Sequence, residues 1–496
     1  MRGKGIMIQG TGSSVGKSLL CAGLCRIFKE DGLSVAPFKA QNMALNSFAT
    51  SEGLEMGRAQ VVQAEAAGIV PDVRMNPVLL KPTSDRQSQV VLNGRPLRNM
   101  TALDYHAFKV TLRENVRAAY ESLAAEYGHI VLEGAGSPAE INLRESDIVN
   151  MAMAEMADVP VLLVGDIDRG GVFASLLGTM EWLTPKERAR VKGVVINKFR
   201  GDVEILRPGL KMLEERIHVP VVGVIPYMKV DLEDEDSLSD RFSAVIGDGD
   251  INIKIVRLDH IANFTDFQSL TLQNGVRVSY ATTARELEGA DIIVLPGTKN
   301  TIGDLLTLRK KGMDAQIIRH ARAGGLVLGV CGGYQMMGSA LYDPEGMESE
   351  TPEAPGLGLI DMTVQFYPGK KTVQTDLTVE DEHGWLAVLC GETLNGYEIH
   401  SGQNTFGSEA VIWLGPDGAR NPAGNVLGTY LHGLFDQGAF AQTLIDHARS
   451  LKGLAARGGE VMTMSKYREE QFDLLARGIR KSLDMPYIYR VLRGEA

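Results

Sequence analysis

The chain has 496 residues, which at about 150 residues per domain is enough for roughly three domains. Hydrophobic residues make up 44% and charged residues 23%, a composition typical of folded globular proteins and not of disordered chains. The 51 Lys and Arg against 62 Asp and Glu leave a net charge of −11, which argues against a nucleic-acid partner.

Further classes are excluded by features that the chain lacks. No apolar run approaches the ~20 residues that a membrane-spanning helix needs. The N-terminus passes directly into a strand-like segment at residues 6–8, without the apolar region of a signal peptide. Four cysteines in so long a chain are too few for a disulfide framework. We therefore expect a cytoplasmic protein with no membrane partner, and we leave its oligomeric state open, a homo-oligomer included.

The charge is distributed unevenly along the chain. Residues 1–100 contain 12 Lys and Arg against 7 Asp and Glu, so this segment carries +5 and the remainder −16. Residues 231–250 contain eight acidic residues and one base. A basic segment within an acidic protein is typical of a site that handles anions, although chance variation in surface charge explains it equally well.

Residues 1–230 alternate short apolar segments with amphipathic ones, such as Lys17–Glu30 with its apolar residues at helical spacing. The short segments are apolar on both faces, as in a parallel sheet that is covered by helices on both sides. The pattern predicts a doubly wound α/β domain, with strands at Gly5–Gln9, Leu33–Pro37, His129–Glu133, Pro160–Gly165, Lys192–Asn197 and Pro220–Ile225.

The second half of the chain begins after an acidic segment, residues 231–250, which we interpret as a linker. Residues 251–440 restart the α/β alternation and become richer in strands with glycine turns after Leu357. Residues 441–496 are predicted to form a helical tail. The chain is therefore expected to hold two α/β domains, at 1–230 and 251–440.

A glycine-rich segment, Gly10-Thr11-Gly12-Ser13-Ser14-Val15-Gly16-Lys17-Ser18, lies between the first expected strand and the first expected helix. The backbone N–H groups of such a loop face phosphate oxygens, its lysine reaches the terminal phosphates, and the hydroxyl after it binds Mg²⁺. Thr11 stands where the strict P-loop pattern has its first glycine. The segment predicts nucleotide binding by Gly12, Ser13, Val15, Gly16, Lys17 and Ser18, with a plain glycine-rich turn as the alternative.

Polar residues stand at the ends of the following strands, and the carboxyl ends of parallel strands share one edge of a sheet. Lys39 follows the second strand, and Glu133 ends the third, where P-loop ATPases keep a carboxylate for the metal. We expect Lys39 near the phosphates, Ser18 and Glu133 as Mg²⁺ ligands, and Asn197 near the nucleotide base. Asp166 and Asp168 end a further strand, and a strand-end cap is the favoured interpretation for them.

A second constellation surrounds Cys331, in Gly329-Val330-Cys331-Gly332-Gly333-Tyr334-Gln335. An apolar strand runs directly into the cysteine and then into an expected helix, with small neighbours that permit a sharp turn. This arrangement is typical of a nucleophile elbow, in which the helix N-terminus lowers the thiol pKa. A buried structural cysteine is the alternative. The thiolate needs a base, and position alone does not separate His400 from His432.

Together, these motifs resemble the cobyric acid synthase and cobyrinic acid diamide synthase family of class I glutamine amidotransferases. The resemblance covers residues 5–440 and rests on the Cys331 segment and Tyr430-Leu431-His432-Gly433, and its N-terminal half is similar to dethiobiotin-synthetase-like ATPases. The segments that match the cobyric acid synthase branch are Phe-Lys-Ala-Gln-Asn-Met at 38–43, Met-Asn-Pro-Val-Leu-Leu-Lys-Pro at 75–82, Glu-Gly-Ala-Gly-Ser-Pro-Ala-Glu at 133–140, Asp-Ile-Asp-Arg-Gly-Gly at 166–171 and Asn-Lys-Phe-Arg-Gly-Asp at 197–202.

The resemblance implies Cys331 as the nucleophile, His432 as its base, and the backbone of Gly297 and Gly332 as an oxyanion hole. Many class I amidotransferases carry Glu two residues after the histidine, whereas this chain has Leu434, so the group that orients His432 is unknown. The implied ligase uses ATP, Mg²⁺ and glutamine to amidate the b, d, e and g carboxylates of adenosylcobyrinic acid a,c-diamide. The expected contacts to this corrinoid are Gln41, Asn42, Lys81 and Arg86.

Three alternatives stay open. The related diamide synthase amidates the a and c acetates of the same ring system, and another amidating enzyme could act on a different polyanion, such as a cell-wall precursor. A P-loop regulator fused to an inactive amidotransferase module is the third. The loop lacks the additional lysine that partitioning-type switch ATPases carry, which counts against the regulator.

Overall fold

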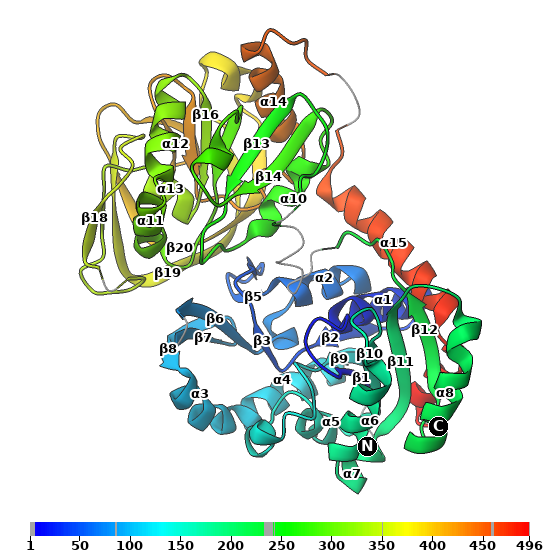
Figure 1. The fold of residues 1–496 in the computed structure, drawn as a ribbon. Coiled ribbons are helices and arrows are strands. Elements are labelled where there is room, and N and C mark those ends of the chain that lie inside the picture. The colour runs from blue at the N-terminus through cyan, green and yellow to red at the C-terminus, as the bar shows by residue number, and fades with distance from the viewer. Residues whose placement is uncertain are drawn as a thin grey trace.

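The computed structural model describes residues 5–84, 87–232, 242, 244–349, 351–457 and 461–495. Arg86 and residues 233–241 and 243 of the expected acidic linker lie outside the described residues. Figure 1 shows two α/β domains stacked one above the other, with both chain termini in the lower, N-terminal domain.

The N-terminal domain is built on a six-stranded sheet in the order β12-β11-β10-β1-β9-β2, in which every pairing is parallel. This sheet confirms the predicted doubly wound α/β fold. The first strand lies between β9 and β10, so the strand order reverses beside it and a crevice opens at its carboxyl end. The strands are β1 (Gly5–Gly10), β2 (Val35–Phe38), β9 (His129–Glu133), β10 (Val161–Asp166), β11 (Val191–Phe199) and β12 (Val221–Pro226).

Residues 41–101 add a smaller sheet, in the order β3-β6-β7-β8, and a separate hairpin of β4 and β5. The hairpin points at the second domain (Figure 1). These strands are β3 (Gln41–Met43), β4 (Ser47–Ala49), β5 (Glu55–Gly57), β6 (Val78–Ser84), β7 (Gln87–Leu92) and β8 (Arg95–Thr101). The helices of the domain are α1 (Lys17–Glu30), α2 (Arg58–Ala67), α3 (Ala102–Lys109), α4 (Arg113–Glu126), α5 (Met151–Met156), α6 (Val172–Trp182), α7 (Pro185–Arg188) and α8 (Val203–Ile217).

The second domain holds a seven-stranded sheet in the order β14-β13-β15-β16-β23-β22-β21. Its pairings are parallel from β14 to β23 and antiparallel beyond. The strands are β13 (Ile251–Val256), β14 (Val276–Ala281), β15 (Ile292–Leu295), β16 (Leu326–Val330), β21 (Val411–Leu414), β22 (Gly418–Arg420) and β23 (Val426–Thr429). The helices are α10 (Gln268–Thr271), α11 (Thr301–Lys310), α12 (Met313–Arg322), α13 (Gly332–Met336) and α14 (Ala439–Leu451).

A long antiparallel hairpin extends this domain toward the N-terminal one (Figure 1). It is formed by β19 (Met362–Thr378) and β20 (Thr393–Phe406), and its sheet is completed by β17 (Ala340–Tyr342) and β18 (Glu353–Pro355). The hairpin meets β4 of the N-terminal domain, so strands from both domains face each other there.

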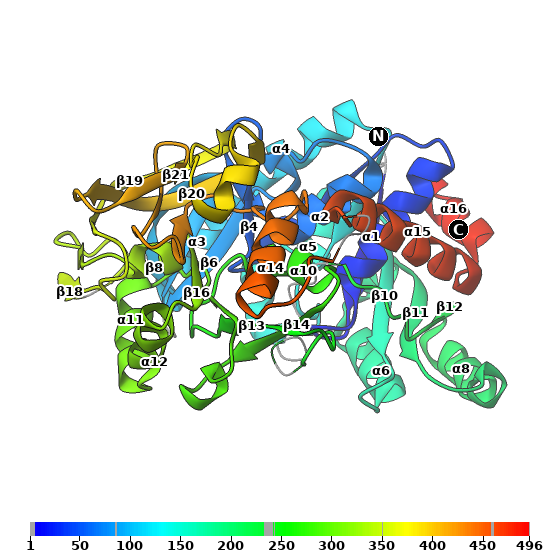
Figure 2. The ribbon, with the colours of Figure 1, turned by 90° about the horizontal axis from the view of Figure 1, so that it is seen from above.

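The tail forms α15 (Met464–Ser482) and α16 (Met485–Arg493), as its helical pattern predicts. These helices leave the second domain and return to the N-terminal one, where α15 lies along α1 (Figures 1 and 2). The tail side chains buried in the core around α1 are Phe472, Leu475, Ala476, Ile479, Leu483, Met485, Ile488, Val491 and Leu492. The core of the N-terminal domain therefore includes the last residues of the chain.

Candidate active sites

The glycine-rich loop curls at the carboxyl end of β1. Gly16 has a φ of +96°, and a Cβ there would lie 2.2 Å from Nδ2 of Asn197, so only glycine fits. The Lys17 ammonium group lies within the loop and donates to the carbonyl of Gly12 at 2.8 Å. Ser13 is exposed, whereas the Val15 side chain is buried and its carbonyl accepts from Asn197 at 2.8 Å. The loop thus has the backbone curvature that phosphate binding requires.

Glu133 is buried at the end of β9 and hydrogen-bonds several polar groups of this crevice. Its Oε1 accepts from the Ser18 hydroxyl at 2.8 Å and from the Lys39 ammonium at 2.9 Å, and its Oε2 accepts from Gln63 at 2.6 Å. Burial alone would raise the pKa of Glu133, but Lys39 and these hydrogen bonds outweigh it and hold the pKa below its usual value. The carboxylate is therefore charged and lies beside the hydroxyl that follows Lys17.

A cavity of about 500 Å³ opens beside the loop. Its wall includes Asn197 and Asp168 from the strand ends and Leu475 and Ile479 from α15, so the tail helix closes one side. Lys198 forms an ion pair with Asp166 at 3.0 Å, and Arg200 donates to Asp168 at 2.9 Å. Both aspartates therefore border the cavity while engaged with basic partners.

The four residues expected to contact a corrinoid fall in different places. Gln41 and Asn42 lie on β3, two and three residues after Lys39, where Tyr105 donates to Gln41 at 2.6 Å and Asn42 donates to Gln60 at 3.1 Å. Lys81 is 3% exposed and lines a different cavity, the one that contains Cys331.

Cys331 lies between β16 and α13 in the strained backbone conformation of a nucleophile elbow, with φ +52° and ψ −114°. The turn requires glycine at position 333, two residues after the cysteine, because a Cβ there would lie 2.1 Å from the carbonyl oxygen of Leu295. A Cβ on Gly297 would lie 3.6 Å from Cβ of Cys331 and 3.5 Å from Cε1 of His432. The structure therefore brings Cys331, Gly332, Gly297 and His432 together.

The structure shows which group orients His432, a question that the sequence alone leaves open. His432 is 1% exposed, and its Nδ1–H donates to Oδ2 of Asp266 at 2.6 Å. Burial alone would lower the pKa of His432, but Asp266 and Cys331 outweigh it and raise the pKa to about 10. Leu434 is a buried core residue. Asp266 lies 166 positions before the histidine, in a segment with no spacing motif, so no sequence signal pointed to it.

His400, the alternative base, borders the same cavity but is engaged elsewhere. Its Nδ1 lies 2.9 Å from the carbonyl oxygen of Gly402, and its ring stacks on Tyr430 with centroids 3.7 Å apart. The cavity measures about 30 Å³, so its walls must separate before a ligand enters. His400 and Ser401 also line a neighbouring cavity of about 390 Å³.

The N-terminal domain completes the wall of the Cys331 cavity. Glu55 on β5 is fully buried and binds two ammonium groups, Lys81 of its own domain at 2.7 Å and Lys370 of β19 at 2.6 Å. Burial alone would raise the pKa of Glu55, but the two lysines hold it well below its usual value. Burial lowers the pKa of Lys81 to about 8. One buried carboxylate thus joins the two domains through two lysines that line the Cys331 cavity.

The β4–β5 hairpin also reaches the residues around His432. The backbone N–H of Ser47 donates to Oδ1 of Asn263 at 2.9 Å, and Nδ2 of Asn263 lies 3.3 Å from Nε2 of His432. Tyr397 donates to the carbonyl of Ser47 at 3.1 Å and stacks on the His432 ring. The histidine is therefore surrounded by groups that the domain contact holds in place.

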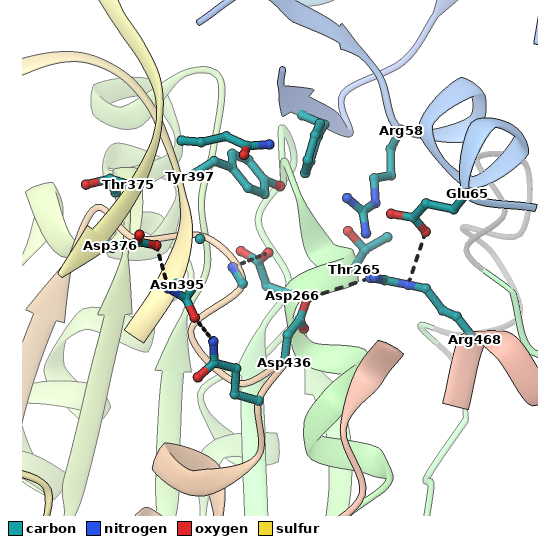
Figure 3. A pocket seen from close by; sticks show the side chains of 15 residues that line it. Arg58, Glu65, Thr265, Asp266, Thr375, Asp376, Asn395, Tyr397, Asp436 and Arg468 are labelled. Carbon is teal, nitrogen blue, oxygen red and sulfur yellow. Dashed lines mark hydrogen bonds and ion pairs between the residues drawn. The ribbon is translucent and has the colours of Figure 1, made fainter. Parts of the chain in front are cut away.

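Asp266 borders a fourth cavity, of about 390 Å³, between the domains. Figure 3 shows Arg468 of the tail helix placed between Glu65 of α2 and Asp436 of the second domain. Its guanidinium lies 3.9 Å from the Glu65 carboxylate and 3.7 Å from that of Asp436. The tail therefore contacts both domains at the back of the His432 site.

Two searches of the described residues complete the survey. No group of three or more His, Cys, Asp or Glu side chains in the described ranges is arranged to hold a metal ion. Within the same ranges, no helix has both the length and the hydropathy for crossing a membrane.

Comparison with known proteins gives one family match for each of the two domains. Residues 6–237 match the CobQ/CobB/MinD/ParA nucleotide-binding domain, and residues 252–440 match the CobB/CobQ-like glutamine amidotransferase domain. The cobyric acid synthase of Alkaliphilus metalliredigens is 51% identical and covers 99% of this chain and 100% of its own. Those of Photorhabdus laumondii and Salmonella arizonae are 50% and 52% identical, each covering 98% or more of both chains.

The fold and the matched domains define the class as a glutamine-dependent, ATP-using amide ligase. Within that class, the chain belongs to the cobyric acid synthase family.

Proposed function

We propose that Cys331 and His432 hydrolyse glutamine. The Cys331 thiolate attacks the side-chain amide carbon, His432 gives its proton to the leaving ammonia, and water then cleaves the glutamyl thioester. The backbone N–H groups of Gly297 and Gly332 stabilise the oxyanion. Asp266 is the positioning residue, because its carboxylate fixes the tautomer of His432 and stabilises the imidazolium. The observation that carries the proposal is that Cys331, Gly297 and His432 line one cavity while Asp266 bonds to the far nitrogen of the histidine ring.

The ammonia then reacts at the N-terminal domain. ATP transfers its terminal phosphoryl group to a substrate carboxylate, and ammonia displaces phosphate from the acyl phosphate to form the amide. Lys17 and Lys39 stabilise the transferred charge, the P-loop from Gly12 to Ser18 holds the phosphates, and Asn197 lies toward the base. The Ser18 hydroxyl and the Glu133 carboxylate are hard oxygen donors 2.8 Å apart, which suits Mg²⁺. The ion would neutralise charge on the phosphates.

The proposed acceptor is adenosylcobyrinic acid a,c-diamide, amidated on its b, d, e and g carboxylates in cobalamin biosynthesis. We propose that Gln41 and Asn42 lie nearest to the corrinoid, because they stand on β3, directly after the segment that carries Lys39. We assign Lys81 to the glutamine cavity, since its side chain lines that cavity and pairs with Glu55 behind it. Arg86 stays a proposed corrinoid contact outside the described residues. A cytoplasmic location belongs to this proposal as an expectation, and the oligomeric state stays open.

The test is an assay with the corrinoid diamide, ATP, Mg²⁺ and either glutamine or ammonium chloride, followed by product mass. The expected product gains four amide groups. Cys331→Ala should abolish synthesis from glutamine and leave synthesis from ammonium unchanged, because only the first needs the thiol. If the enzyme turns over ATP but the mass of the corrinoid does not change, the proposed substrate is wrong. Loss of both activities in Cys331→Ala would overturn the division of labour.

A further inference from the structure

The Cys331 cavity contains a buried ammonium group whose role the proposed chemistry leaves open. Lys299 is 8% exposed and lines this cavity, together with Cys331 and His432. Among the residues that the structure describes, its ammonium group has no hydrogen bond or ion pair, whereas Lys81 and Lys370 share Glu55. A buried cation costs free energy unless an anion accompanies it. The anion expected beside Lys299 is therefore one that arrives with a ligand.

Glu348 supplies a negative charge to the same cavity and is held in place from two sides. The buried Asp343 carboxylate accepts the backbone N–H groups of Met347, Glu348 and Ser349 at 2.7, 2.9 and 2.8 Å, which fixes the loop. The Thr301 hydroxyl donates to Oε2 of Glu348 at 2.9 Å, which fixes the side chain.

The two charges lie near each other and near the thiol. Burial lowers the pKa of Lys299, and the charges of Glu348 and Cys331 both act against that change, so all three lie within electrostatic reach. The substrate of a glutaminase carries both charges on one carbon, an α-carboxylate and an α-ammonium group. A cavity that offers a cation and an anion on its wall matches that pattern.

We propose that Lys299 binds the α-carboxylate of glutamine and Glu348 binds its α-ammonium group. This pair, the α-clamp, rests on the proposed function, since it assigns how the substrate of the Cys331 site is held. It orients the side-chain amide toward Cys331 and selects a free amino acid over simple amides and over glutamine residues within a peptide, whose α-groups are blocked.

The first experiment measures glutamine hydrolysis by the full chain. Lys299→Met and Glu348→Gln should each raise KM for glutamine by about 10- to 100-fold, the range of one charge-assisted hydrogen bond, and leave kcat within about threefold. Synthesis from ammonium chloride should not change. Lys310→Met and Glu345→Gln are matched controls, because both residues are exposed and lie on the neighbouring segments.

The second experiment assigns each charge to its residue. Glutarate monoamide lacks the α-ammonium group and 4-aminobutanamide lacks the α-carboxylate. Glu348→Gln should lower kcat/KM for glutamine and 4-aminobutanamide and leave that for glutarate monoamide within about twofold of the wild-type value, because a missing group cannot lose a contact. Lys299→Met should spare 4-aminobutanamide instead.

The rate at which Cys331 is alkylated separates ligand binding by Lys299 and Glu348 from a purely structural role of these residues. The glutamine analogue 6-diazo-5-oxo-L-norleucine should inactivate both variants about tenfold more slowly or worse, whereas iodoacetamide, which has no α-groups, should react at the wild-type rate. Equal changes for all three amides, or slower reaction with both reagents, would overturn the α-clamp alone. Absence of glutamine hydrolysis in the wild-type enzyme would overturn the proposed function and the α-clamp with it. If Lys299→Met fails to fold, Glu348→Gln decides the matter.

Discussion

At the scale of single residues, the charge on Asp266 is expected to set the alkaline limit of glutamine hydrolysis. The carboxylate favours the imidazolium form of His432 and, together with Cys331, raises its pKa from 6.5 to about 10 against the effect of burial. Asp266→Asn removes that stabilisation and lowers the pKa, which moves the alkaline limit of the rate to lower pH. The rate itself should fall about 10²-fold, since the tautomer is no longer fixed. The rate of glutamine hydrolysis, measured from neutral pH upward, tests both effects.

Asp436→Asn is the matched control, because Asp436 borders the same cavity as Asp266 (Figure 3) but accepts a hydrogen bond from the Ser269 hydroxyl instead of one from His432. It should leave the position of the alkaline limit unchanged. A wild-type rate and pH profile in Asp266→Asn would exclude a positioning role for this carboxylate.

Glu133 gives the complementary prediction for the N-terminal site. Glu133→Gln keeps the size of the side chain but removes the charge beside Ser18 and Lys39, so ATP turnover and amide synthesis should fall by about 10² or more from either nitrogen source. Glutamine hydrolysis should persist. Glu140→Gln, an exposed change in the same segment, is the control. Equal loss of glutamine hydrolysis in Glu133→Gln would contradict the separation of the two sites.

Sequence patterns found the residues whose chemistry depends on local backbone. The elbow around Cys331 and the P-loop around Lys17 each lie within one strand–turn–helix unit, so their spacing is visible in the chain. Asp266 meets His432 across 166 positions, and Lys81 lies in a cavity formed by the other domain. Tertiary contacts alone determine such partners, and a single sequence carries no spacing for them.

At the scale of elements, α15 is expected to behave as a core helix of the N-terminal domain. Phe472 is 1% exposed in the core around α1, so Phe472→Ala should lower the free energy of unfolding by about 3 to 5 kcal/mol. Leu474 on the same helix is 42% exposed, and Leu474→Ala should change it by less than about 0.5 kcal/mol. Denaturant unfolding of the two variants measures the difference, and similar effects would contradict the packing of α15.

The strands that the sequence predicts and those that it does not predict differ in what determines their structure. All six strands of the parallel sheet were predicted because strands covered on both faces form continuous apolar runs. The strands at 41–101 were not: β3, β4 and β5 have only three residues each, and β8 is exposed over its first five residues. Their side chains carry no clear alternation, and pairing with neighbouring strands determines their structure.

At the scale of the whole molecule, Glu55 is the charge that joins the domains. Glu55→Gln leaves Lys81 and Lys370 buried without their anion and should destabilise the protein by about 3 to 5 kcal/mol. Because the folded pKa of Glu55 lies below its ordinary 4.5, its contribution is complete above about pH 4.5 and is lost as the pH falls. Denaturant unfolding at neutral and acidic pH measures both.

The double variant Glu55→Gln/Lys370→Met serves as the control for Glu55→Gln, since it removes one of the two uncompensated charges. It should recover part of the lost stability. If Glu55→Gln is as stable as the wild type at neutral pH, the buried ion pairs do not hold the domains together.

The return of the tail has a consequence for synthesis on the ribosome. The N-terminal domain is translated first, yet Phe472, Ile479 and Ile488 of its core emerge only after the whole amidotransferase domain. Domains generally fold in the order of their synthesis, but here the amidotransferase domain is an insertion, complete before its host. Part of the apolar face of α1 therefore stays exposed until α15 and α16 have been made. The cavity beside the glycine-rich loop, whose wall includes Leu475 and Ile479, is completed only after α15 has been made.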